Sequence, residues 1–111
     1  MSEKSVKTVE SRRYQRMVVP EGFGIRVSGR ENGNVLEGIA SVIGLGGMFC
    51  RTNDRLSPGT NLILRMTWAA SSFEAECSVR HANEQGMGIE FLHFRPEDRQ
   101  KLERLLFRLQ S

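Results

Sequence analysis

The sequence feature that most limits the possible folds of this chain is a set of short runs in which apolar and polar side chains alternate. In residues 73–80 the alternation is unbroken, with Phe73, Cys77 and Val79 on the apolar face. This two-residue period is typical of a strand that is buried on one face only. It recurs along the chain, and we expect six short strands over residues 24–30, 35–42, 47–51, 62–68, 73–80 and 87–92.

Turn residues separate these runs. Asn32-Gly33 is the strongest short hairpin signal. Pro58-Gly59 presets one backbone angle and permits a positive φ at the glycine. Residues 69–72 and 83–86 are short connections. Six short antiparallel strands with tight links predict a mainly β domain, either a barrel or a sandwich.

The end of the chain has a helical pattern instead. Pro96 opens it, and Glu97 and Asp98 suit the first turn of a helix. An apolar stripe follows at helical spacing, and we expect it to pack on the barrel: Leu102, Leu105, Leu106 and Leu109. Phe107 lies off the stripe and is a candidate exposed contact.

The length of 111 residues predicts one domain. Residues 1–10 are polar and without a hydrophobic period, so we expect a flexible N-terminal arm followed by one domain over residues 11–111. No segment is apolar enough for membrane insertion or a secretory signal, which predicts a cytoplasmic protein. In that setting Cys50 and Cys77 are expected to be buried, reduced thiols rather than a disulfide.

The positive charge is localised. The net charge is +3, and the first sixteen residues carry five basic and two acidic side chains, so the rest of the chain is neutral. A basic arm suits an anionic partner. The same arm also fits a solvated tail that aids solubility, and one basic cluster with one tyrosine does not make a DNA interface.

No catalytic or metal-binding pattern is present in the sequence. His81 and His93 have no serine, cysteine or carboxylate at a catalytic spacing, and we interpret both as structural. No Lys-Ser/Thr pair follows the glycine-rich residues 44–47, so they are not a phosphate-binding loop of the Walker type. We therefore expect neither an enzyme nor a cofactor.

Two segments remain as candidate binding elements. Arg12, Arg13 and Arg16 carry planar guanidinium groups that can pair with phosphate or with the edge of guanine, and Tyr14 adds a stacking surface. The glycine-rich residues 44–47 indicate either a barrel corner or a backbone that something approaches closely.

The order of these segments resembles the PilZ domain over residues 11–109. An Arg-x-x-x-Arg arm comes first, and a glycine-rich corner follows about 30 residues later. The run from Gly86 to Phe91 and the helix start at residues 96–99 are especially similar to the family's C-terminal pattern. The resemblance implies a six-stranded antiparallel β-barrel with a C-terminal α-helix. It also implies a receptor that binds cyclic di-GMP and reports the ligand to a protein partner.

The ligand residues of the family match this chain unevenly. Arg12 and Arg16 match its arginine pair, and Arg13 lies between them. The second motif is normally Asp/Asn-x-Ser-x-x-Gly. Aligned on Gly47, it has Val42 at the acidic or amide position and Gly44 at the serine position. Losing two hydrogen bonds weakens binding by roughly 30-fold to several thousand-fold.

The sequence leaves two functions open. The first is a receptor in which cyclic di-GMP orders the arginine arm against the barrel and changes the surface offered to a partner. The second is a degenerate PilZ adaptor that binds no cyclic di-GMP and acts by protein contact alone, as in pilus or motility regulation. Either is compatible with a monomer or a homodimer.

Overall fold

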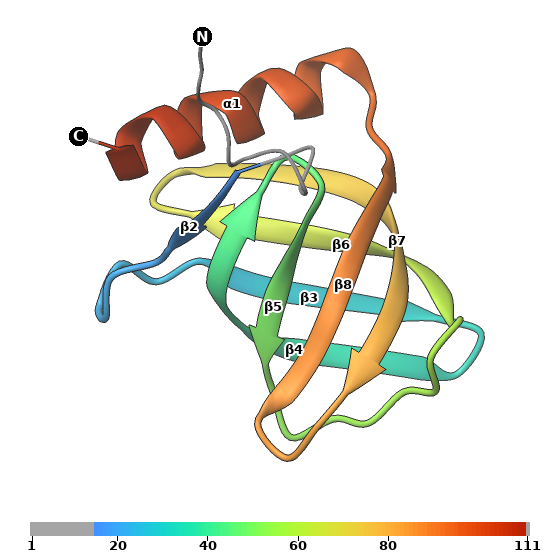
Figure 1. The fold of residues 1–111 in the computed structure, drawn as a ribbon. Coiled ribbons are helices and arrows are strands. Elements are labelled where there is room, and N and C mark those ends of the chain that lie inside the picture. The colour runs from blue at the N-terminus through green and yellow to red at the C-terminus, as the bar shows by residue number, and fades with distance from the viewer. Residues whose placement is uncertain (1–14, 111) are drawn as a thin grey trace, which may run out of the picture.

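The computed structural model describes residues 15–110 as a closed antiparallel barrel with one outer strand and one helix (Figure 1). The strands are β2 (Arg16–Val18), β3 (Arg26–Glu31), β4 (Asn34–Gly44), β5 (Gly47–Arg51), β6 (Asn61–Trp68), β7 (Ser71–Ala82) and β8 (Gly86–His93). The helix α1 (Pro96–Gln110) follows them. The predicted β-barrel with a C-terminal helix is confirmed. The division proposed at residue 10 lies outside the described residues.

The barrel closes because β4 pairs along both of its sides. Its first half pairs with β3, and its second half pairs with β5, so the order β4-β3-β6-β7-β8-β5 returns to β4. A bulge between Ala40 and Val42 shifts the register between the two halves. Bulges bend a strand and increase its twist, which a closing sheet requires.

The predicted turns form with the expected backbone geometry. Asn32 and Gly33 both have positive φ, 52° and 83°, in the β3–β4 hairpin. Gly59 has φ 93°, and the amide of Thr60 donates to the carbonyl of Ser57 at 3.0 Å. The glycines therefore sit where the chain must adopt conformations that other residues rarely take.

The inward faces of the strands form one core. Fully buried members include Ile43, Met48, Leu64 and Met87. The helix α1 lies across one end of the barrel (Figure 1) and adds Leu102 and Leu105 to this core, as the leucine stripe predicts. One contact holds the far end of α1: the Arg108 guanidinium lies 5.7 Å from the centroid of the Trp68 ring, and that ring is itself stacked on Phe23 with centroids 5.1 Å apart.

Asp98 fixes the start of α1 to the barrel. Its carboxylate is buried and accepts hydrogen bonds from Arg95 Nε at 2.8 Å and from the backbone amide of Glu74 at 3.2 Å. Burial raises the pKa of Asp98, but these hydrogen bonds outweigh burial, so the pKa lies below its usual value. The carboxylate therefore stays ionised inside the fold at neutral pH.

We expect Asp98→Asn to destabilise the fold by about 1–3 kcal/mol, because Arg95 loses its charged acceptor. The lowered pKa stabilises the native state above the unfolded pKa, and that contribution is lost as pH falls through the folded value. Urea unfolding at neutral and acidic pH measures both effects. Glu97→Gln, an exposed neighbour with the same charge change, is the control, and an equal effect of the two variants would contradict the assignment.

Both thiols are free and buried, as the sequence predicts. Burial raises the pKa of Cys50 and of Cys77 to about 12. We expect neither thiol to react with a thiol reagent at about pH 8 in the native protein, and both to react once urea unfolds it. Since the unfolded thiols ionise near pH 9, stability should fall as pH rises from there toward 12. Fast labelling of the native protein would show that the two side chains are accessible.

Candidate functional site

The outer strand β2 brings an arginine of the N-terminal motif onto the glycine-rich segment. Arg16 pairs with Gly44, Met17 with Ile43, and Val18 with Val42 in an antiparallel ladder. Gly47 begins β5 just across the β4–β5 connection from Gly44. Of the candidate ligand residues, Arg16, Val42, Gly44 and Gly47 therefore lie together, whereas Arg12, Arg13 and Tyr14 lie outside the described residues.

Gly44 and Gly47 are glycines because backbone occupies the space of a side chain. A Cβ atom on Gly44 would collide with the carbonyl oxygen of Gln15 and lie 3.3 Å from Arg16 Cα. A Cβ on Gly47 would collide with the carbonyl oxygen of Ile89. The first glycine admits β2, and the second lets β5 and β8 approach closely. Both expectations for this segment, a barrel corner and a close approach, are met.

A row of side chains crosses the outer face of the barrel beside this point. Val42 stands opposite Val18 on one side and Phe49 on the other, and Phe49 stands opposite Gly88, which in turn faces His81. Directly paired residues of antiparallel strands point to the same face, so these residues share one surface. Val18 is 76% exposed at one end of the row. The row is apolar at Val18 and Val42 and aromatic at Phe49 and His81.

The imidazole of His81 occupies the space that a side chain at position 88 would fill. A Cβ at Gly88 would collide with the ring, and the ring centroids of His81 and Phe49 are 6.2 Å apart with an interplanar angle of 28°. The two rings form an aromatic ledge next to Val42. The sequence pattern did not bring these two residues together. It indicated a structural role for His81, and the structure adds that this residue is exposed on the outer face. One feature of the sequence could have indicated this arrangement. Gly88 is a glycine at an outward-facing position of a predicted strand, which leaves room for a side chain from a neighbouring strand.

Among the residues that the structure describes, this surface carries no metal site. Within residues 15–110 no group of three or more His, Cys, Asp or Glu side chains could hold an ion. His93 is exposed on β8 opposite Glu76. In the same described range, no helix is long and apolar enough to cross a membrane.

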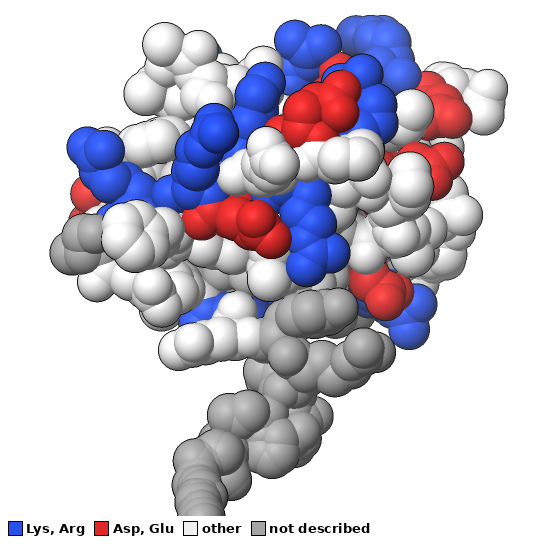
Figure 2. All heavy atoms as spheres, turned by 90° about the horizontal axis from the view of Figure 1, so that it is seen from above, with Lys and Arg blue, Asp and Glu red and all other residues white. Residues whose placement is uncertain are grey.

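The surface that carries α1 has mixed charge. Figure 2 shows lysines and arginines along this face with acidic side chains between them. Ion pairs join some of them, such as Arg99 with Glu103 at 3.3 Å and Arg95 with Asp98 at 2.8 Å. This alternation differs from the continuous basic stripe typical of a nucleic-acid interface.

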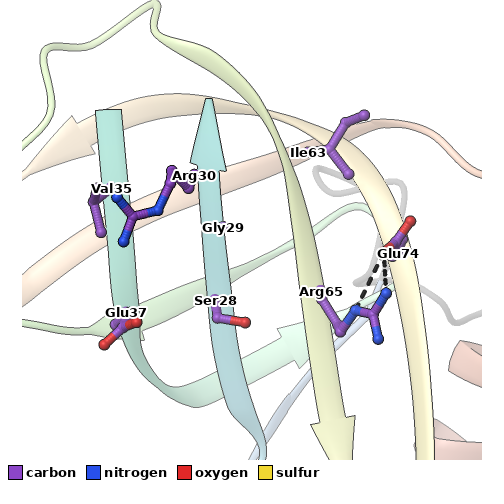
Figure 3. A pocket seen from close by; sticks show the side chains of 8 residues that line it. All are labelled: Ser28, Gly29, Arg30, Val35, Glu37, Ile63, Arg65 and Glu74. Atoms are coloured by element: carbon purple, nitrogen blue, oxygen red, sulfur yellow. Dashed lines mark hydrogen bonds and ion pairs between the residues drawn. The ribbon is translucent and has the colours of Figure 1, made fainter. Parts of the chain in front are cut away.

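A separate hollow of about 380 Å³ lies on the outer face of β3, β4, β6 and β7 (Figure 3). Arg30 and Arg65 line it together with Glu37 and Glu74, and Arg65 donates two hydrogen bonds to Glu74 at 2.7 and 3.2 Å. Its charges are balanced, and none of its lining residues belongs to β2 or to the glycine-rich segment. It is therefore not part of the candidate ligand site.

Comparison with known proteins places the chain in a family. The model of the PilZ domain matches residues 10–108, so the chain belongs to the PilZ domain family. No curated protein sequence matches it. The family assignment agrees with the resemblance on which the sequence analysis relied.

Solved structures share the fold at low sequence identity. The PilZ domain of YcgR from Escherichia coli with c-di-GMP superposes with a TM-score of 0.77 at 16% identity, covering 91% of this chain and 92% of that one. The Bacillus subtilis inhibitor of motility, MotI/DgrA, gives 0.72 at 23% identity, covering 91% of this chain and 51% of that one. YcgR from Escherichia coli in complex with c-di-GMP gives 0.70 at 19% identity, and this chain covers 46% of it. The chain thus spans about half the length of two of these neighbours.

Proposed function

We propose that this chain is a non-enzymatic cyclic di-GMP receptor of bacterial second-messenger signalling, acting in the cytoplasm. The observation that carries the proposal is the pairing of Arg16 with Gly44, which puts the arginine of β2 directly across from the segment that corresponds to the family's second ligand motif. Two of the structural neighbours are described with c-di-GMP bound. Membership of the PilZ family agrees with this role.

The geometry offers complementary groups for such a ligand. Arg16 is exposed and can pair with a phosphate or with O6 and N7 of guanine. The ledge formed by Phe49 and His81 is a flat surface on which a purine can rest. Arg12 and Arg13, at the start of the arm, would supply further guanidinium groups.

The signal would pass through β2 and the preceding arm. β2 is three residues long and pairs along one side only, so few backbone hydrogen bonds hold it. It also contacts α1. A ligand that binds better when the arm is docked shifts the equilibrium toward the docked arm, which changes the surface offered to a protein partner.

The second candidate is an adaptor that acts by protein contact without the nucleotide. The favouring observation is that Val42 has no polar atom in its side chain, while the side-chain space at Gly44 is filled by the backbone of Gln15. Both positions at which the family uses a polar group are therefore closed to that role. Under this alternative Arg16 would pair with carboxylates of the partner.

Calorimetric titration of the full chain with cyclic di-GMP at moderate salt separates the two. The receptor predicts saturable heat with one binding isotherm, and GMP at the same concentration is the control. A rise in the unfolding midpoint with ligand should accompany it, because a ligand that binds only the folded state stabilises it. No heat and no shift at millimolar cyclic di-GMP would leave the adaptor as the function.

Val42→Asp tests whether the lost polar position limits affinity. The side chain is half-buried on the outer face, so a carboxylate fits without entering the core. We expect tighter binding of cyclic di-GMP by about tenfold to a hundredfold, because a charge-assisted hydrogen bond to a guanine N–H contributes about 1.5–3 kcal/mol. Val42→Asn should give a smaller gain. If calorimetry shows equal affinity in all three proteins, Val42 does not face the ligand.

A further inference from the structure

A second hollow lies next to the candidate ligand site, between the β2–β3 loop and the strands β4 and β5. Its volume is about 530 Å³. Its apolar lining comes from Val19, Pro20, Ile39 and Ala40, and its polar lining from Glu21, Ser41 and Arg51, with Gly22 and Gly24 completing the wall.

The hollow exists because the loop leaves the edge of β4 and returns to it. The amide of Val19 donates to the carbonyl of Ser41 at 2.9 Å, and the amide of Ala40 donates to the carbonyl of Ile25 at 3.0 Å. Between these anchors Gly22 and Gly24 take positive φ, 87° and 82°, which carries the backbone outward.

The loop is held in its outward position. The amide of Phe23 donates to the carbonyl of Pro20 at 3.0 Å and closes a turn. The Phe23 ring stacks on Trp68, with 4° between the ring planes. Because the turn and the stack fix the wall, the hollow is a built feature of the fold.

Two arginines flank the apolar floor of the hollow. Ile39, which is 51% exposed, stands opposite Arg26 on β3 and opposite Arg51 on β5. Both arginines are exposed, and among residues 15–110 neither makes an ion pair or a side-chain hydrogen bond. Arg65 in the other hollow, by contrast, is bonded to Glu74 (Figure 3).

We propose that this hollow docks a segment of a partner protein in which one apolar side chain is flanked by acidic residues. The apolar side chain covers Ile39 and Val19, and the carboxylates reach Arg26 and Arg51. The lining itself holds one carboxylate, Glu21, and one arginine, Arg51. Arg26, which stands opposite Ile39 on β3, adds a second positive charge beside the hollow. This deepens the proposed function, on which it rests, by assigning the surface that the receptor offers to its partner.

The position of the hollow couples it to the ligand site. Val19 follows Val18 directly, so one wall of the hollow continues the strand that carries Arg16. Ser41 on the opposite wall precedes Val42. The hydrogen bond from the Val19 amide to the Ser41 carbonyl therefore links the pairing of β2 with β4 to the wall of the hollow.

Synthetic peptides with a central leucine between two glutamates on each side are the probe, and the same peptide with lysines in place of glutamates is the control. Fluorescence anisotropy measures affinity, and amide NMR shifts locate binding. We expect the acidic peptide to shift the amides of Ile39 and Ser41, and Arg51→Glu and Arg26→Glu each to weaken its binding at least about fivefold. Glu21→Lys should strengthen it by a similar factor. Arg30→Glu, the same charge change at the far end of β3, should leave affinity unchanged.

Several outcomes would overturn the docking site. These are equal affinity for acidic and lysine peptides, an equal loss in Arg30→Glu and Arg51→Glu, or no shifts at Ile39 and Ser41 at millimolar acidic peptide. Calorimetry with cyclic di-GMP on the parent protein and on Arg51→Glu separates this inference from the proposed function, and we expect the variant to bind the nucleotide as the parent does. In the parent protein, nucleotide binding without peptide binding overturns only the docking site. If the peptide binds, its affinity falls in Arg26→Glu and Arg51→Glu, and the nucleotide does not bind, the docking site is supported and only the receptor function is overturned.

Discussion

Replacing Arg16 by alanine should weaken cyclic di-GMP binding by about tenfold to a hundredfold or more. Arg16 is exposed on β2 and stands opposite Gly44, so its loss removes a charged donor from the candidate site and leaves the core intact. A hydrogen bond to a charged group contributes about 1.5–3 kcal/mol, and each 1.4 kcal/mol corresponds to a tenfold change in affinity. Calorimetric titration of the variant and the parent protein at one salt concentration measures the effect.

The control for that variant is Arg30→Ala. Arg30 is an exposed arginine of β3 that pairs with Val35, away from β2 and the glycine-rich segment, so it carries the same charge change without the contact. Its affinity for cyclic di-GMP should match the parent protein. If both variants lose affinity equally, the effect is one of net charge, and Arg16 is not a ligand contact.

Gly44→Ser restores the serine of the family motif, yet we expect it to release β2 instead of improving binding. The new Cβ would collide with the carbonyl oxygen of Gln15, and only a shift of backbone relieves the overlap. Overpacking of this kind costs about 1–3 kcal/mol. In a domain of this size each kcal/mol lowers the unfolding midpoint by about 4–8 °C. Thermal unfolding and hydrogen exchange at the amides of Met17 and Val19 measure the loss.

Gly44→Ala is the matched variant, because it adds the same Cβ without a hydroxyl. Equal destabilisation and equal loss of protection in the two variants would assign the effect to the Cβ atom. Tighter cyclic di-GMP binding in Gly44→Ser, with β2 still protected from exchange, would contradict the structural argument. It would show that the backbone of β2 can shift to accommodate the serine side chain without loss of stability.

Local patterns were sufficient to predict the barrel and the helix. The alternation in residues 73–80 indicated the longest strand, now β7, and Asn32-Gly33 indicated the β3–β4 hairpin. These signals are local, since they depend on neighbours within a few residues. The leucine spacing in α1 likewise predicted which face would be buried.

The strand β2 and the aromatic ledge could not be predicted in the same way. β2 has only three residues, too few to display a period, and its partner Gly44 is 28 positions away from Arg16. Phe49 and His81 come together only through the register of β5, β8 and β7. The sequence analysis identified Gly44 as a lost serine, whereas the structure explains why a glycine is needed there. The ligand contacts themselves remain predictions.

Closure of the barrel also limits how the protein can extend its sheet. Among residues 15–110, β2 is the one strand with a single neighbour in the sheet, so its free side is an edge along which a β-strand from another molecule could add hydrogen bonds. Pro20 follows soon after β2 and has no N–H to donate, which stops such growth toward the β2–β3 loop. The free edge that β2 offers for edge-to-edge association is therefore only three residues long.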